Sequence, residues 1–123
     1  KKFTLLGDST DIFNVCWYAE PNTYDEVTTW IKLHKDLIDI NHQATYGLTC
    51  LMFAIMREKI NIARFLIKEF DCDLSLKVNK EYTNKLITGK KIKEGTSIMD
   101  MIKQSKYKKT LLYDIKEKKK IKE

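Results

Sequence analysis

Apolar residues recur at intervals of three and four along much of the chain, which is the spacing of an amphipathic helix. The clearest segment is 49–67, in which a polar break at 57–59 separates two apolar groups. The first group comprises Leu51, Met52, Ala54 and Ile55, and the second comprises Ile60, Ala63, Leu66 and Ile67. Thr49 has a side chain that commonly caps a helix. We therefore predict two short helices joined by a turn.

Two further segments show the same hairpin pattern. Residues 11–35 contain one apolar stretch before Pro21 and a second after Thr23, which is spaced from Glu26 as in a capping box. Residues 97–115 carry two more apolar groups at helical spacing. Helices this short are marginal alone in water. We therefore predict an all-α fold in which helix hairpins stack into a short solenoid.

Two of the predicted units open and close with related strings. GLTCLMFAI begins at Gly47, and GTSIMDMIK begins at Gly95, which is 48 positions later. Asp-Leu-Ser at 73–75 follows the second unit, and Asp-Ile-Asn at 39–41 follows the first. The segment 45–77 resembles an ankyrin repeat, whose pattern places Gly-x-Thr before the first helix and Asp-apolar-Asn after the second.

The resemblance implies one ankyrin-repeat domain, 1–123, that binds a protein partner. It divides the chain into a first repeat at about 8–41, a second at 45–77, an insertion at 78–93, a third at 94–116 and a basic tail at 117–123. The chain departs from the family where Cys50 replaces Pro, Met52 replaces His and Glu58 replaces the Gly between the helices. The first unit lacks the Gly-x-Thr opening, which indicates a degenerate or capping repeat.

The insertion enlarges the loop between the second and third units. Ankyrin units recur about every 33 residues, so a spacing of 48 leaves roughly 15 extra residues. We predict a β-hairpin with strands at 86–88 and 91–93 and a turn at Gly89 and Lys90. The alternative is a solvated lysine-rich loop without a role, because long surface insertions cost little stability.

Charge is unevenly distributed along the chain, although the whole has a formal net charge of +6. Residues 3–76 carry eleven acids and six bases, whereas 77–93 carry six lysines and one acid. Residues 103–122 carry nine lysines and two acids. This pattern predicts an acidic body with a basic finger loop and a basic tail.

The resemblance implies that partner contacts flank the Gly-x-Thr opening, end the first helix of the repeat and lie on the finger. These candidate contacts are Thr45, Tyr46, Leu48, Met56, Arg57, Tyr82, Lys85, Lys90, Lys91 and Lys93. A basic finger predicts an acidic protein partner. Two alternatives stay open: contact of the finger and tail with nucleic acid or an anionic membrane, and a regulatory domain of a larger enzyme. We expect a monomer.

Residues typical of catalysis or metal binding are sparse. His34 and His42 have no partner at metal-ligand spacing. The three cysteines, Cys16, Cys50 and Cys72, are too scattered for a disulfide framework and indicate reduced thiols in an intracellular protein. We expect no enzymatic activity, no metal, no cofactor and no transmembrane segment. Because the chain does not begin with Met, we expect it to be part of a longer protein.

Overall fold

The computed structural model describes residues 24–83 and 91–122. Its elements in chain order are α2 (Tyr24–Leu33), the 3₁₀ turns η2 (Lys35–Leu37) and η3 (Thr45–Gly47), α3 (Cys50–Met56), α4 (Ile60–Glu69), the strands β1 (Tyr82–Thr83) and β2 (Lys91–Ile92), α5 (Ile98–Gln104) and α6 (Lys108–Lys122). The described residues are mostly helical, which confirms that part of the predicted class. The helix expected before Pro21 and the capping Thr23 lie outside the described residues.

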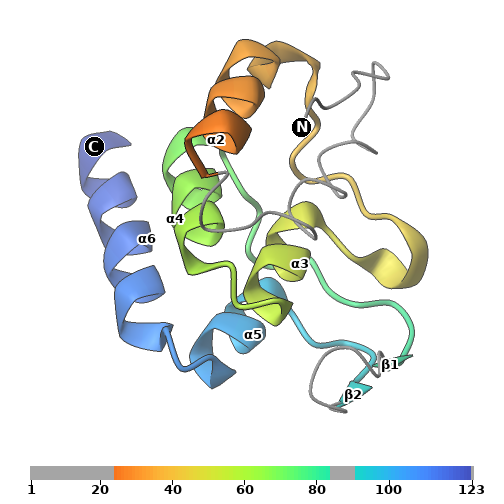
Figure 1. The fold of residues 1–123 in the computed structure, drawn as a ribbon. Coiled ribbons are helices and arrows are strands. Elements are labelled where there is room, and N and C mark those ends of the chain that lie inside the picture. The colour runs from red at the N-terminus through yellow and green to blue at the C-terminus, as the bar shows by residue number, and fades with distance from the viewer. Residues whose placement is uncertain (1–23, 84–90, 123) are drawn as a thin grey trace.

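The helices lie in two rows (Figure 1). α3 pairs with α4 and α5 pairs with α6, so each pair forms a helix hairpin. The two hairpins pack side by side, with α3 against α5 and α4 against α6. α2 extends the second row by packing on α4. The loop around η3 and the β1–β2 ladder lie on the side of the molecule away from α6.

One apolar core runs through all the described helices. Each of the five helices contributes a large, fully buried side chain to it: Ile31, Leu51, Leu66, Ile102 and Leu111. Burial of such a side chain contributes about 1.5–3 kcal/mol relative to leaving it in water. The predicted helix faces are confirmed here, because helical spacing alone selects the buried side.

Polar caps fix where the first helix of each hairpin begins. The Thr49 hydroxyl accepts a hydrogen bond from the Met52 amide, and the Ser97 hydroxyl accepts one from the Asp100 amide. The Asp100 carboxylate accepts in return from the Ser97 amide at 3.1 Å, completing a capping box. The Thr49 cap was predicted, because the N–H groups of a first helical turn need acceptors that Ser and Thr supply locally. The Ser97 cap was not predicted from the sequence.

The finger contains a two-stranded antiparallel ladder, but its first strand lies earlier than predicted. Tyr82 pairs with Ile92, and Thr83 pairs with Lys91. The predicted partner strand 86–88 and the turn at 89–90 lie outside the described residues. Tyr82 and Ile92 are both half-buried and pack against the core, and this packing sets the register.

Within the described residues, the segment predicted as a basic tail is the C-terminal part of helix α6. α6 continues to Lys122, and an ion pair near its middle ties it to α4. Arg64 donates to the Asp114 carboxylate from Nε at 2.8 Å and from its terminal nitrogen at 3.3 Å. Asp114 is only 1% exposed, so this pair fixes the rotation of α6 about its axis. The same hydrogen bonds raise the pKa of Arg64 above its ordinary value.

Candidate partner-binding surface

The turn before α3 holds its backbone in a left-handed conformation at two successive residues. Tyr46 has a φ of 65°, and Gly47 has a φ of 76°. Glycine adopts this conformation freely, but a side chain costs roughly 1–2 kcal/mol there. The turn therefore presents the Tyr46 ring at the expense of local strain.

Hydrogen bonds from the neighbouring loop hold this strained turn. The Asn79 amide donates to the Tyr46 carbonyl at 2.9 Å. The Gln43 side chain donates to the carbonyls of Gly47 and Lys77, each at 2.9 Å. The loop of the second unit is thus fastened to the loop that leads into the finger.

The fastened loops bring two predicted contact residues together. The rings of Tyr46 and Tyr82 meet edge to face, with their centroids 5.3 Å apart and an interplanar angle of 69°. This is a favourable aromatic geometry. Tyr46 is 37% exposed and Tyr82 is half-buried, so the pair offers an aromatic surface anchored at one side.

Exposed lysines of the finger accompany the tyrosine pair. Lys91 and Lys93 are both exposed, as predicted for contact residues, and so is Lys80 just before β1. Lys85 and Lys90 lie outside the described residues, as does the side chain of Thr45. The Tyr46–Tyr82 pair together with Lys80, Lys91 and Lys93 is called the finger site below.

Three other predicted contacts do not join the finger site. Leu48 is 2% exposed and belongs to the core, so its assignment as a contact is corrected. The left-handed turn reverses the chain just before it and directs this side chain inward. Met56 and Arg57 are half-buried at the far end of α3, about 10 Å along the helix from the turn.

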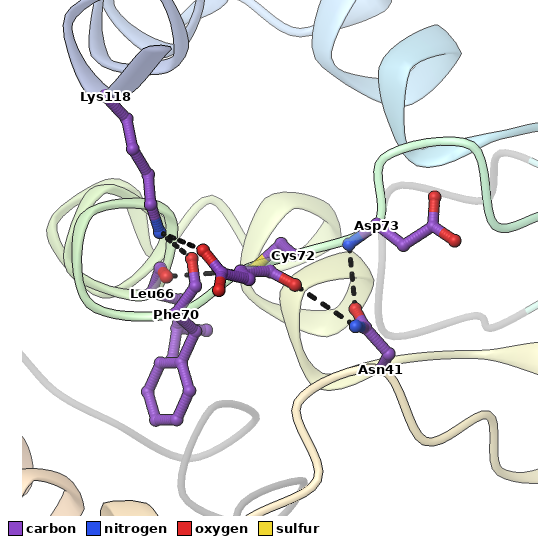
Figure 2. A network of polar contacts seen from close by, with 7 residues as sticks. Asn41, Leu66, Phe70, Cys72, Asp73 and Lys118 are labelled. Atoms are coloured by element: carbon purple, nitrogen blue, oxygen red, sulfur yellow. Dashed lines mark hydrogen bonds and ion pairs between the residues drawn. The ribbon is translucent and has the colours of Figure 1, made fainter. Parts of the chain in front are cut away.

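A polar network joining three segments was missed from the sequence (Figure 2). Lys118 of α6 donates to the Phe70 carbonyl and lies 3.6 Å from the Asp71 carboxylate. Asn41 donates to the Asp71 carbonyl at 3.1 Å and accepts from the Asp73 amide at 2.8 Å. The only sequence signal is the Asp-Ile-Asn string that contains Asn41. The network ties the ends of successive units together and serves structure.

The same segment contains a half-buried cysteine. Loss of solvation raises the pKa of the Cys72 thiol to about 12, and the thiol lies 3.6 Å from the Leu66 carbonyl. Thiolate is the nucleophilic form of cysteine, so this side chain is unreactive at neutral pH. Cys50 is buried and also outside any disulfide, whereas Cys16 lies outside the described residues.

Among residues 24–83 and 91–122, no group of three or more His, Cys, Asp or Glu side chains is arranged to hold a metal ion. None of the described helices is long and apolar enough to cross a membrane. Comparison with known proteins found no match for the chain among family models, curated proteins or solved structures. Its function is therefore inferred from its own residues.

Proposed function

We propose that the chain is a short stack of ankyrin repeats that binds an acidic protein partner through the finger site. The family assignment is supported by local structural features that recur in successive units. Gly47 and Gly95 both have positive φ, and each lies two positions before a helix cap. Asp39 and Asp73 each accept a hydrogen bond from the amide two residues later. Such recurrence is typical of a repeat architecture.

The contact between Tyr46 and Tyr82 carries the binding proposal. These residues lie 36 positions apart in the sequence, and their rings meet at 5.3 Å on a fastened pair of loops. Tyrosines are enriched among residues that dominate binding energy, and rigid presentation lowers the entropy cost of association. Strained residues such as Tyr46 concentrate at functional sites.

The lysines determine the chemical class of the partner. Lys80, Lys91 and Lys93 are exposed in or beside β1 and β2, and so are two acids, Glu81 and Glu94, so these five positions carry a net charge of +1. An acidic partner surface is therefore favoured, and its association rate falls as salt concentration rises.

Affinity capture from a nuclease-treated lysate tests this proposal. Tyr46→Gly removes the exposed ring and relieves the strained backbone, while Leu33→Ala removes an exposed apolar side chain on α2 and serves as the control. We expect the wild type and the control to retain the same protein and Tyr46→Gly to lose it. Retention of that protein by all three would refute the finger site. Circular dichroism confirms that each variant is folded.

A further inference from the structure

The outward side of α6 carries a stripe of lysines interrupted by one tyrosine. Lys109, Tyr113, Lys116 and Lys120 are all exposed, and Tyr113 is 60% exposed. At 3.6 residues per turn these positions fall within about 60° of one another around the axis and span about 16 Å along it. We call these four residues the α6 stripe.

The opposite side of α6 fixes which way the stripe faces. Leu111 and Ile115 are buried in the core, and Asp114 is paired with Arg64 of α4. The Asp114 carboxylate therefore lies on the side of α6 away from the stripe, and Arg64 neutralises its charge.

The positive charge of the stripe is largely uncompensated. Glu117 lies 3.7 Å from Lys120, and this is the ion pair that the stripe makes within the described residues. Lys109 and Lys116 form no ion pair with any carboxylate in that part of the chain. An exposed row of three lysines beside one glutamate keeps a net positive charge, which attracts polyanions.

The exposed ring distinguishes between classes of polyanion. Lysines bind phosphates, and an exposed aromatic ring among them is a platform on which an unpaired base stacks. A helix that lies in a membrane surface turns its apolar face to the lipid, but Leu111 and Ile115 of α6 are buried in the core. We propose that the α6 stripe binds single-stranded nucleic acid, with lysines on the phosphates and Tyr113 stacked on a base.

This site is separate from the finger site. α6 and the β1–β2 ladder lie on opposite sides of the molecule in Figure 1, with α3 and α5 between them. Nucleic-acid contact by finger and tail together was one of the alternatives from the sequence, whereas the proposal made here concerns α6 alone. The two proposals therefore stand or fall independently.

Fluorescence anisotropy with a labelled 20-nucleotide oligothymidylate tests the α6 stripe. The triple variant Lys109→Gln, Lys116→Gln, Lys120→Gln is compared with Lys80→Gln, Lys91→Gln, Lys93→Gln, which removes the same charge from the finger. We expect the first to weaken binding at least ten-fold and the second less than three-fold. The logarithm of affinity should fall with the logarithm of salt with a slope of about −2, because each phosphate contact to a single strand contributes roughly −0.7.

Tyr113→Leu and two competing ligands complete the test. Loss of stacking predicts at least a five-fold weaker complex for Tyr113→Leu. Equal losses in both triple variants would show dependence on net charge alone and would overturn the proposal. So would a duplex of the same length that binds more tightly than the single strand, or binding to phosphatidylserine vesicles without binding to the oligonucleotide. All substituted side chains in the stripe are exposed, and circular dichroism verifies the fold.

Discussion

The second and third units begin with the same turn in different surroundings. Gly47 has a φ of 76° and Gly95 a φ of 88°, so both turns need the left-handed conformation. A Cβ at Gly47 would lie 2.9 Å from the Asn79 nitrogen and from the Lys77 oxygen. A Cβ at Gly95 would meet nothing within 4 Å. Both turns need a residue that adopts a positive φ. Only at Gly47 does a neighbouring loop also leave no room for a side chain.

Core positions of the two units differ in the same way. Leu51 is 1% exposed, whereas Met99, which lies 48 positions later, is half-buried. The second unit is covered by α2 on one side and by α5 and α6 on the other, whereas the third is covered on one side by the described elements. Equivalent residues of the two units are therefore expected to contribute different amounts to the free energy of unfolding.

The largest predicted effect is at the core pair. Leu51→Ala should cost about 3 kcal/mol of unfolding free energy, because it removes a fully buried side chain and leaves a cavity. Met99→Ala should cost about 1 kcal/mol, since its side chain is already half in water. Urea unfolding at fixed temperature measures both, and equal losses would contradict the difference between the units.

The glycine pair should show the next largest effect. Gly47→Ala and Gly95→Ala each introduce a side chain at positive φ, which costs roughly 1–2 kcal/mol. Gly47→Ala must also push apart the backbone at Lys77 and Asn79, which should add about 1–2 kcal/mol. Thermal unfolding of the two variants compares them. Equal destabilisation by the two substitutions would show that the close packing of the Gly47 turn against Lys77 and Asn79 contributes little to stability.

At the turn between α3 and α4, one substitution is expected to stabilise the fold. Glu58 has a φ of 56°, and its carboxylate lies 3.5 Å from Lys106 with both side chains more than half exposed. Glu58→Gly should stabilise the fold by about 1 kcal/mol, because relief of the left-handed strain exceeds the loss of an exposed ion pair. Glu58→Ala is the control that keeps the strain. A glycine variant no more stable than the alanine variant would contradict this account.

The smallest predicted effect concerns the two helix caps. Hydrogen bonds from the Ser97 amide, and then from its side chain, hold the pKa of Asp100 below the ordinary carboxyl value, whereas Met52 occupies the equivalent position after Thr49. Because the folded pKa is lowered, this stabilisation is present above the ordinary carboxyl pKa and is lost as the pH falls through the lowered one. An NMR titration of the Asp100 carboxyl group should show the low pKa. A pKa at the ordinary carboxyl value would contradict the predicted loss of this unit's stability at acidic pH.

Local features of the fold were predictable from the sequence. Thr49 was identified as a cap from the sequence, and its hydroxyl accepts from the amide three positions later. The buried faces of α3 and α4 followed from helical spacing. These features depend on neighbours within a turn or two of helix, which a single sequence displays directly.

Features that depend on distant segments were not predictable. Leu48 was assigned to the surface by resemblance, but the left-handed turn at Tyr46 and Gly47 directs it into the core. The Arg64–Asp114 pair joins residues 50 positions apart, and no local pattern marks either partner. At the candidate site, the sequence named Tyr46 and Tyr82 separately, and only the fastening of the loops brings their rings together.

Photo-crosslinking from position 46 tests the central claim most directly. A benzoylphenylalanine at Tyr46 replaces one aromatic side chain with another, and the same group at Leu33 of α2, which is 76% exposed, is the control. The account predicts a covalent adduct between position 46 and the protein retained in affinity capture, and none from position 33. An adduct from position 33 alone, or from both positions equally, would contradict the assignment of the Tyr46–Tyr82 edge as the partner-binding surface.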